Sequence, residues 1–223
     1  MSRYLDFCQS WMRDPRGNRA ADRAVRNTTV PRLDFRKRFR ARAVLFGGGE
    51  YDGANPKQDT WEWDSAGRAW TERTVTGAKP EARTGHAFAY DPIRKVAVLF
   101  GGSMGSGYLS DTWEWDGAAG TWSLRVAASC APSARFGHTM AYDVGQARTV
   151  LVGGYANGTT LDEVWEWNGS SASWANLGSA APMPSRYQHA MVFDGDRGKM
   201  VVFGGVCVPT AGANSRLFDL WER

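Results

Sequence analysis

The stretch that decides the fold is VAVLFGGSMGSGYLSDTWEWD, residues 96–116. Its first segment, residues 96–100, is apolar throughout, which is typical of a short strand covered on both faces. A diglycine follows, and then the string Trp113-Glu114-Trp115. Because successive side chains of a strand point to opposite faces, we expect both tryptophans to face one way and Glu114 the other.

The same order of residues recurs nearly four times, with a period of about fifty residues. Each unit holds a diglycine, a Trp-Glu-Trp string, a lone Trp seven residues later, and an Arg-x-x-His motif that leads into an apolar run. Repetition at this period is the signature of a propeller, whose blades each bury one face against the next. The repeated positions, to which we assign structural roles, are Gly47, Gly48, Trp61, Trp63, Trp70, Arg83, His86, Gly101, Gly102, Trp113, Trp115, Trp122, Arg135, His138, Gly153, Gly154, Trp165, Trp167, Trp174, Arg186, His189, Gly204, Gly205 and Trp221.

Each unit is expected to form four short strands, because its apolar segments are short, rich in Val, Phe, Tyr and Trp, and bounded by Gly, Pro, Asp and Ser. In the second unit the strands are predicted at residues 85–90, 96–100, 112–115 and 121–124. A diglycine allows a bulky neighbour to approach the backbone closely. We expect that neighbour to be the lone Trp of the fourth strand.

These motifs resemble those of kelch-repeat β-propellers, whose bacterial units read Arg-x-x-His, Tyr-Asp, Leu-Phe-Gly-Gly and Asp-Thr-Trp-Glu-Trp. The resemblance runs from about Ala41 to Trp221. It implies an all-β propeller of four-stranded antiparallel blades within the galactose-oxidase-like propeller superfamily. Counting the units gives about four blades, fewer than propellers of this family usually have, so a partial propeller is expected. The blades are expected near residues 41–76, 83–126, 135–177 and 186–223, with the first and the last incomplete.

The first 40 residues carry no repeat and differ in charge from the rest. Residues 1–42 hold 12 Lys and Arg against 4 Asp and Glu, which leaves 15 against 19 for residues 43–223. The basic balance therefore belongs to this arm. The arm shows neither an amphipathic period nor a nucleic-acid-reading motif, so nucleic-acid binding is not favoured. We interpret residues 1–40 as a disordered arm or as a segment not native to the fold, for example as the result of a frame error upstream of Arg40.

Three histidines could suggest a metal site, but His86, His138 and His189 occupy equivalent slots in successive units. Metal ligands must converge on one ion, so structural hydrogen bonding is favoured and no metal or other cofactor is predicted. The repeated Arg83, Arg135 and Arg186 are expected to form internal ion pairs with the equally regular Glu62, Glu114 and Glu166.

The segments after each diglycine vary while the strands stay periodic, and such loops are where binding usually resides. Tyr51, Asp52, Tyr108 and Tyr155 are the candidate binding residues on this loop rim. Aromatic groups there suit a protein or carbohydrate partner. Open blade edges also predict self-association.

The resemblance favours a non-catalytic binding module, with no catalytic residues assigned. Two alternatives stay open, namely a carbohydrate-active enzyme on the same scaffold (oxidase or mutarotase-like) and a truncated gene product without independent function. A copper oxidase needs histidine ligands, and every histidine here stands in a repeat slot.

Three cysteines do not make a disulfide framework, and free thiols are favoured for Cys130 and Cys207 over a bridge between them. The sequence contains no apolar run long enough to span a membrane and no signal-peptide pattern. The cellular location is not predicted, since the N-terminus itself is in question.

Overall fold

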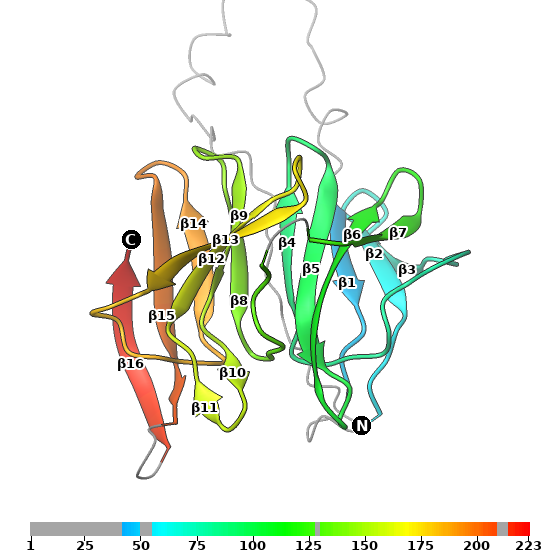
Figure 1. Ribbon diagram of the computed structural model, residues 1–223. Coiled ribbons are helices and arrows are strands. Elements are labelled where there is room, and N and C mark those ends of the chain that lie inside the picture. Colours follow the sequence, from blue (N-terminus) through cyan, green and yellow to red (C-terminus); the bar gives the residue numbers. More distant parts are fainter. Residues whose placement is uncertain (1–41, 50–54, 128–129, 209–213) are drawn as a thin grey trace, which may run out of the picture.

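The computed structural model describes residues 42–49, 55–127, 130–208 and 214–223. All regular structure within these residues is β, arranged as four antiparallel sheets and one short hairpin. The sheets follow one another in chain order from one side of Figure 1 to the other, where the C-terminus lies. We number them blades 1 to 4. The all-β organisation in successive antiparallel sheets that the sequence predicts is confirmed.

Blades 2 and 3 are four-stranded sheets. Blade 2 consists of β4 (Ala87–Asp91), β5 (Val96–Ser103), β6 (Tyr108–Asp116) and β7 (Thr121–Arg125). Blade 3 consists of β8 (Thr139–Asp143), β9 (Arg148–Val152), β12 (Glu163–Asn168) and β13 (Ser173–Ser179). The loop between β9 and β12 carries a hairpin of β10 (Tyr155–Ala156) and β11 (Thr159–Thr160).

Blades 1 and 4 show three strands each within the described residues. Blade 1 consists of β1 (Arg42–Phe46), β2 (Thr60–Asp64) and β3 (Ala69–Glu72). Blade 4 consists of β14 (Ala190–Asp194), β15 (Lys199–Cys207) and β16 (Ser215–Glu222). The arm predicted at residues 1–40 lies outside the described residues.

In blades 2, 3 and 4 an aspartate fixes the hairpin that joins the first two strands. In blade 2 an oxygen of Asp91 accepts the backbone N–H groups of Ile93 and Arg94, at 3.0 Å each. Such an Asx turn replaces backbone partners that the tight loop cannot supply. Asp143 and Asp194 make the same turn in the next two blades, so the recurring aromatic-Asp pair is a turn signal.

The first strands of blades 2, 3 and 4 lie side by side, β4 against β8 and β8 against β14. Backbone hydrogen bonds join the turns that precede them. The N–H of Gly137 donates to the carbonyl of Gly85 at 2.7 Å, and the N–H of Gln188 donates to that of Gly137 at 2.6 Å. These first strands therefore form the inner edge of the blade array, and their spacing is set by backbone contacts.

The core lies between blades, in three apolar clusters. Trp113 and Trp115 of blade 2 pack together against Phe46 of blade 1, which confirms that the two tryptophans share a face. The lone tryptophans pack across the same boundaries, because Trp122 Nε1 donates to Thr60 Oγ1 and Trp174 Nε1 donates to Thr112 Oγ1, both at 3.0 Å. Each fourth strand thus ties its blade to the preceding one.

The expectation that a lone Trp covers each diglycine is wrong. Gly101 and Gly102 have φ values of 62° and 106°. A Cβ on Gly101 would lie 2.8 Å from the carbonyl oxygen of Arg135 and 3.1 Å from the ring of His138. The diglycine therefore makes room for the Arg-x-x-His turn of the following blade, while the lone Trp faces the preceding blade.

Candidate binding surface

The repeated arginines are buried clamps at the base of the loops. Arg83, with a fully buried side chain, donates to both carboxylate oxygens of Asp111 at 2.6 and 2.7 Å and to the carbonyl of Gly101 at 3.0 Å. Its Nε donates to the carbonyl of Glu81 at 3.0 Å. The guanidinium thus joins the connection between blades 1 and 2 to the diglycine of β5 and to β6, which are the two ends of the loop that follows the diglycine in blade 2.

The same clamp recurs in blades 3 and 4. Arg135 donates to Glu163 at 2.6 Å, and Arg186 donates to both carboxylate oxygens of Asp219 at 2.7 and 2.8 Å. The acid is therefore the residue two positions before the first tryptophan of the string, or before Trp221 in blade 4. Our expectation that these arginines pair with Glu62, Glu114 and Glu166 is wrong. Bidentate pairing suits the planar guanidinium.

The glutamates of the first two Trp-Glu-Trp strings instead connect neighbouring blades. Glu62 accepts the Nε1–H of Trp115 at 3.2 Å, and Glu114 accepts the Nε1–H of Trp167 at 3.3 Å. Glu114 also receives Arg94 at 2.7 Å. In β2 and β6 this face of the strand therefore supplies acceptors for buried indole N–H groups of the next blade.

Each of the three histidines stands three residues after a clamp arginine, where the chain enters the first strand of blade 2, 3 or 4. His86 and His138 stand edge-on to Phe46 and Phe100 of the preceding blades, with ring centroids 5.7 and 5.5 Å apart. His189 Nε2 lies 2.6 Å from Thr139 Oγ1 of blade 3. Within the described part of the chain, no three His, Cys, Asp or Glu side chains form a group that could hold a metal ion.

Burial, followed by the charge of the nearby clamp arginine, lowers the pKa of His86 and of His189 to about 3. Burial, the charge of Arg135 and the other two imidazoles hold the pKa of His138 well below its usual value. All three rings are therefore neutral at physiological pH.

Four aromatic side chains from three blades meet where the loops leave the inner edge. Tyr155 lies 5.5 Å from Phe136 and 5.3 Å from Tyr187, measured between ring centroids. Phe136 lies 5.0 Å from Tyr108 and 5.8 Å from Tyr187. Tyr108 is exposed and the other three are partly exposed. We call these four residues the aromatic cluster.

The clamps hold this cluster in place. Phe136 directly follows Arg135, and Tyr187 directly follows Arg186. Phe136 and Tyr155 exchange two backbone hydrogen bonds of 2.9 and 3.2 Å, and Tyr187 exchanges two with Val206. Two of the four rings therefore sit on backbone fixed by a buried ion pair at the adjacent residue.

The sequence singled out two members of the cluster, Tyr108 and Tyr155. The other two candidate rim residues, Tyr51 and Asp52, lie outside the described residues. Phe136 and Tyr187 were missed, although aligning the units on their arginines would have found them. The residue after the arginine is Thr84, Phe136 and Tyr187 in turn, so this position varies between units while the arginine and the histidine of the motif are kept.

Both described cysteines are free. Cys130 is exposed and Cys207 partly buried, with its sulfur 3.8 Å from Ser185 Oγ. No described segment forms a helix long and apolar enough to cross a membrane.

The geometry defines a propeller array whose blades are joined by aromatic, glutamate and arginine contacts repeated from blade to blade. Comparison with known proteins agrees, since the family model described as the KLHDC2/KLHL20/DRC7 Kelch-repeats domain matches residues 38–222. The chain belongs to the kelch-repeat family.

A curated relative is the Mei4-dependent protein 6 of Schizosaccharomyces pombe, which is 28% identical over 138 residues. That alignment covers 55% of this chain and 19% of the relative. The chain therefore matches about a fifth of that protein's length.

Proposed function

We propose that the chain is a non-catalytic protein-binding module and that the aromatic cluster is the centre of its contact surface. The observation that carries this proposal is the convergence of Tyr108, Phe136, Tyr155 and Tyr187 on one partly exposed patch. Aromatic side chains dominate binding energy at protein interfaces because they bury a large area at a small entropic cost. Kelch-repeat membership supports the same role.

A rigid support adds to the case. Ordering flexible side chains on binding costs free energy. Here the backbone beneath two of the rings is tied to a buried arginine and to a neighbouring loop, so less ordering remains to be done. The four rings also present both faces and edges, and the tyrosines carry hydroxyls that can exchange hydrogen bonds with a partner.

A photo-crosslinking experiment tests this proposal. A benzophenone amino acid at position 108 should link the chain to a discrete polypeptide, and the same group at Val144 should not. Val144 is 48% exposed and follows the opposite end of β8 from Phe136. The Tyr187→Ala variant should weaken the captured partner's affinity at least about 30-fold, and Val144→Ala should leave it unchanged. Crosslinking that survives Tyr187→Ala, or binding to oligosaccharides alone on a glycan array, would overturn the proposal.

We also propose that the chain self-associates through its two outer blade faces. Trp122 and Trp174 are about 5% and 2% exposed because the preceding blade covers them, whereas Trp70 of blade 1 is 47% exposed. At the other end, Phe203 is 51% exposed, while its register equivalents Phe100 and Val152 are buried. Blade 1 thus presents the tryptophan side of a blade junction and blade 4 the side that receives it.

Light scattering after size exclusion should give a mass above the 24.6 kDa of a single chain. The Phe203→Glu variant should return it to 24.6 kDa, because a charge would have to be buried against the tryptophans. Ile93→Glu is the matched control, since Ile93 is a 64% exposed apolar residue in a hairpin turn. A wild-type monomer would contradict self-association.

A further inference from the structure

The dipeptide Asn-Gly occurs twice within the described residues, as Asn157-Gly158 and as Asn168-Gly169. In this dipeptide the backbone nitrogen of the glycine can attack the side-chain amide of the asparagine, because glycine has no side chain to hinder the approach. Both copies lie in turns of blade 3. One chain therefore allows the same two residues to be compared in two surroundings.

The first copy forms the two-residue turn between β10 and β11. Asn157 and Gly158 have φ values of 49° and 85°, as in the type I′ turns of β-hairpins. Both residues are exposed, and a Cβ on Gly158 would meet no atom within 4 Å. The hairpin comprises two residue pairs. Because a two-stranded hairpin of this size is only marginally stable, its tip opens at low cost.

The second copy is held in place on both of its residues. Oδ1 of Asn168 accepts the backbone N–H groups of the two residues after Gly169, at 3.0 and 3.3 Å. Gly169 is buried, and its carbonyl accepts Arg94 and Arg125 at 3.1 Å each. A Cβ on Gly169 would collide with the guanidinium of Arg94. Rotation of this turn would therefore break contacts with two arginines.

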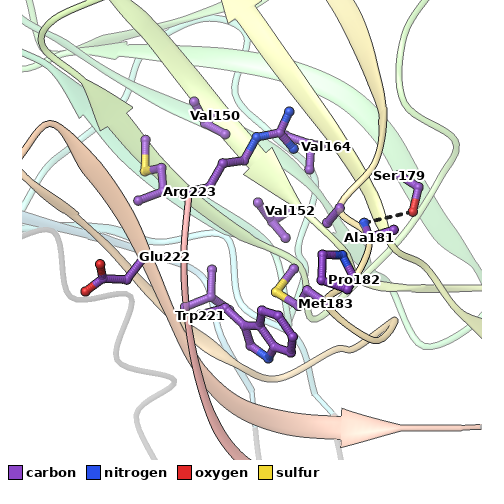
Figure 2. Close-up of a pocket in the computed structure, with 13 residues that line it drawn as sticks. Val150, Val152, Val164, Ser179, Ala181, Pro182, Met183, Trp221, Glu222 and Arg223 are labelled. Carbon is purple, nitrogen blue, oxygen red and sulfur yellow. Dashed lines mark hydrogen bonds between the residues drawn. The ribbon is translucent and has the colours of Figure 1, made fainter.

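The strands that the second copy joins, β12 and β13, are also fixed at their opposite end. There Ser179 Oγ accepts the N–H of Ala181 at 3.1 Å and donates to Asp162 at 2.5 Å. Figure 2 shows Ser179 and Ala181 at the pocket between blades 3 and 4, which Val164 of β12 also lines. β12 pairs with β9 on its other side. Opening the second turn therefore disturbs a four-stranded sheet, whereas opening the first disturbs a hairpin tip.

We propose that Asn157 is a site of spontaneous covalent modification, at which its side-chain amide becomes a carboxylate. The backbone nitrogen of Gly158 forms a bond to Cγ of Asn157, and the bond from Cγ to the side-chain nitrogen breaks. That nitrogen leaves as ammonia and takes the proton of the Gly158 amide with it. Water then adds to one of the two carbonyl carbons of the cyclic imide and opens the ring. Opening at one carbon gives aspartate, and opening at the other gives isoaspartate.

The modification changes the hairpin that carries Tyr155 of the aromatic cluster. Either product adds a negative charge two residues from Tyr155. Isoaspartate also lengthens the backbone by one carbon, in a turn whose length sets the register of the two strands. The two backbone hydrogen bonds between Tyr155 and Phe136 therefore lie next to an altered backbone. The modification itself does not depend on the function proposed for the cluster.

Peptide mass spectrometry of the full chain, incubated at pH 8.5 and 37 °C, tests the proposal. Asn157 should gain the mass of an OH group in place of NH₂, and part of the product should accept a methyl group from an isoaspartate methyltransferase. Asn168 is the matched control, where conversion should be at least about tenfold slower. Equal rates at the two asparagines, or no conversion at Asn157, would overturn the proposal.

Two variants separate the chemistry from its surroundings. Gly158→Ala places a methyl group beside the attacking nitrogen, where the structure leaves space for it, and should slow conversion of Asn157 several-fold. Conversion at the wild-type rate would exclude attack by this nitrogen. Arg94→Met releases Gly169 and should speed conversion of Asn168 several-fold, with Asn157 unchanged. An equal rise at both asparagines would mean that the reaction follows general unfolding, against the proposal.

Hydrogen exchange measures the effect on the hairpin. In the isoaspartate form, separated by ion exchange, the amides of residues 155–160 should exchange faster than in the fresh chain, while those of residues 163–168 should not change. Equal exchange of the first segment in the two forms would show that the hairpin is not altered.

Discussion

Lowering the pH from 6.5 to 5 is expected to remove about 4 to 5 kcal/mol of folding free energy. The folded-state pKa values of His86 and His189 are lowered to about 3, and that of His138 is also well below 6.5. In the unfolded chain all three rings bind protons below about pH 6.5. Because the unfolded state then binds more protons than the folded state, stability is full above this pH and falls as the pH decreases. Urea midpoints measured at half-unit steps of pH would report this slope.

The His138→Gln variant provides the control. It removes one of the three proton-binding groups, so the dependence of the unfolding free energy on pH between 6.5 and 5 should fall by about a third. The clamp carboxylates act in a separate window. Burial would raise the pKa of Asp111, but the hydrogen bonds and charge of Arg83 outweigh it and lower that pKa, so this contribution is lost only below about pH 4. A flat profile from pH 6.5 to 5 would contradict the assignment of neutral buried imidazoles.

Asp111→Ala is expected to destabilise the fold by about 3–5 kcal/mol, because it leaves the guanidinium of Arg83 buried without a counter-charge. The same change removes the acceptor of Trp113 Nε1, which donates to Asp111 at 2.6 Å. The measurement is the urea midpoint at pH 7.5, where the histidine effect is absent. If the slope of the unfolding free energy against urea concentration is unchanged, the variant has lost stability and the folded unit has kept its size.

Glu222→Gln is the matched control for this pair. Glu222 accepts Arg197 at 2.6 Å, but both side chains are exposed, and solvent-exposed pairs contribute little. We expect its midpoint to match that of the wild type. Equal effects of Asp111→Ala and Glu222→Gln would mean that the clamp is not a determinant of stability.

Local patterns of the sequence predicted local structure well. The strands expected near residues 96–100, 112–115 and 121–124 are β5, β6 and β7, and the alternation in Trp113-Glu114-Trp115 places both indoles in one cluster. These features follow from the two-residue period of a strand and from turn chemistry, which neighbouring residues determine.

Contacts between blades could not be predicted in the same way. Arg83 has both a glutamate and an aspartate in regular slots, and the period alone does not distinguish them. The choice of Asp111 depends on which acid lies beside the loop base where the guanidinium emerges. The neighbour of the diglycine could not be predicted for the same reason. The glycines indicate that another group approaches the backbone closely, but they do not tell whether that group comes from the same blade or from the next one.

The aromatic cluster was half predicted. Tyr108 and Tyr155 stand in loops and were visible as aromatic residues outside the strands. Phe136 and Tyr187 directly follow the arginine of a structural motif, at a position whose residue differs from unit to unit, so the regular period did not indicate them.

The backbone hydrogen bonds that join Gly85, Gly137 and Gln188 at the inner edge affect which residues can change during evolution. Since these hydrogen bonds and the clamps hold positions 84, 136 and 187 by main-chain and buried contacts, the side chains at these positions are free to change without altering the support. The side chains of Thr84, Phe136 and Tyr187 can therefore be substituted without moving the backbone that carries them. If the aromatic cluster is the contact surface that we propose, substitutions at these three positions would change the partner that is bound while the strands keep their positions.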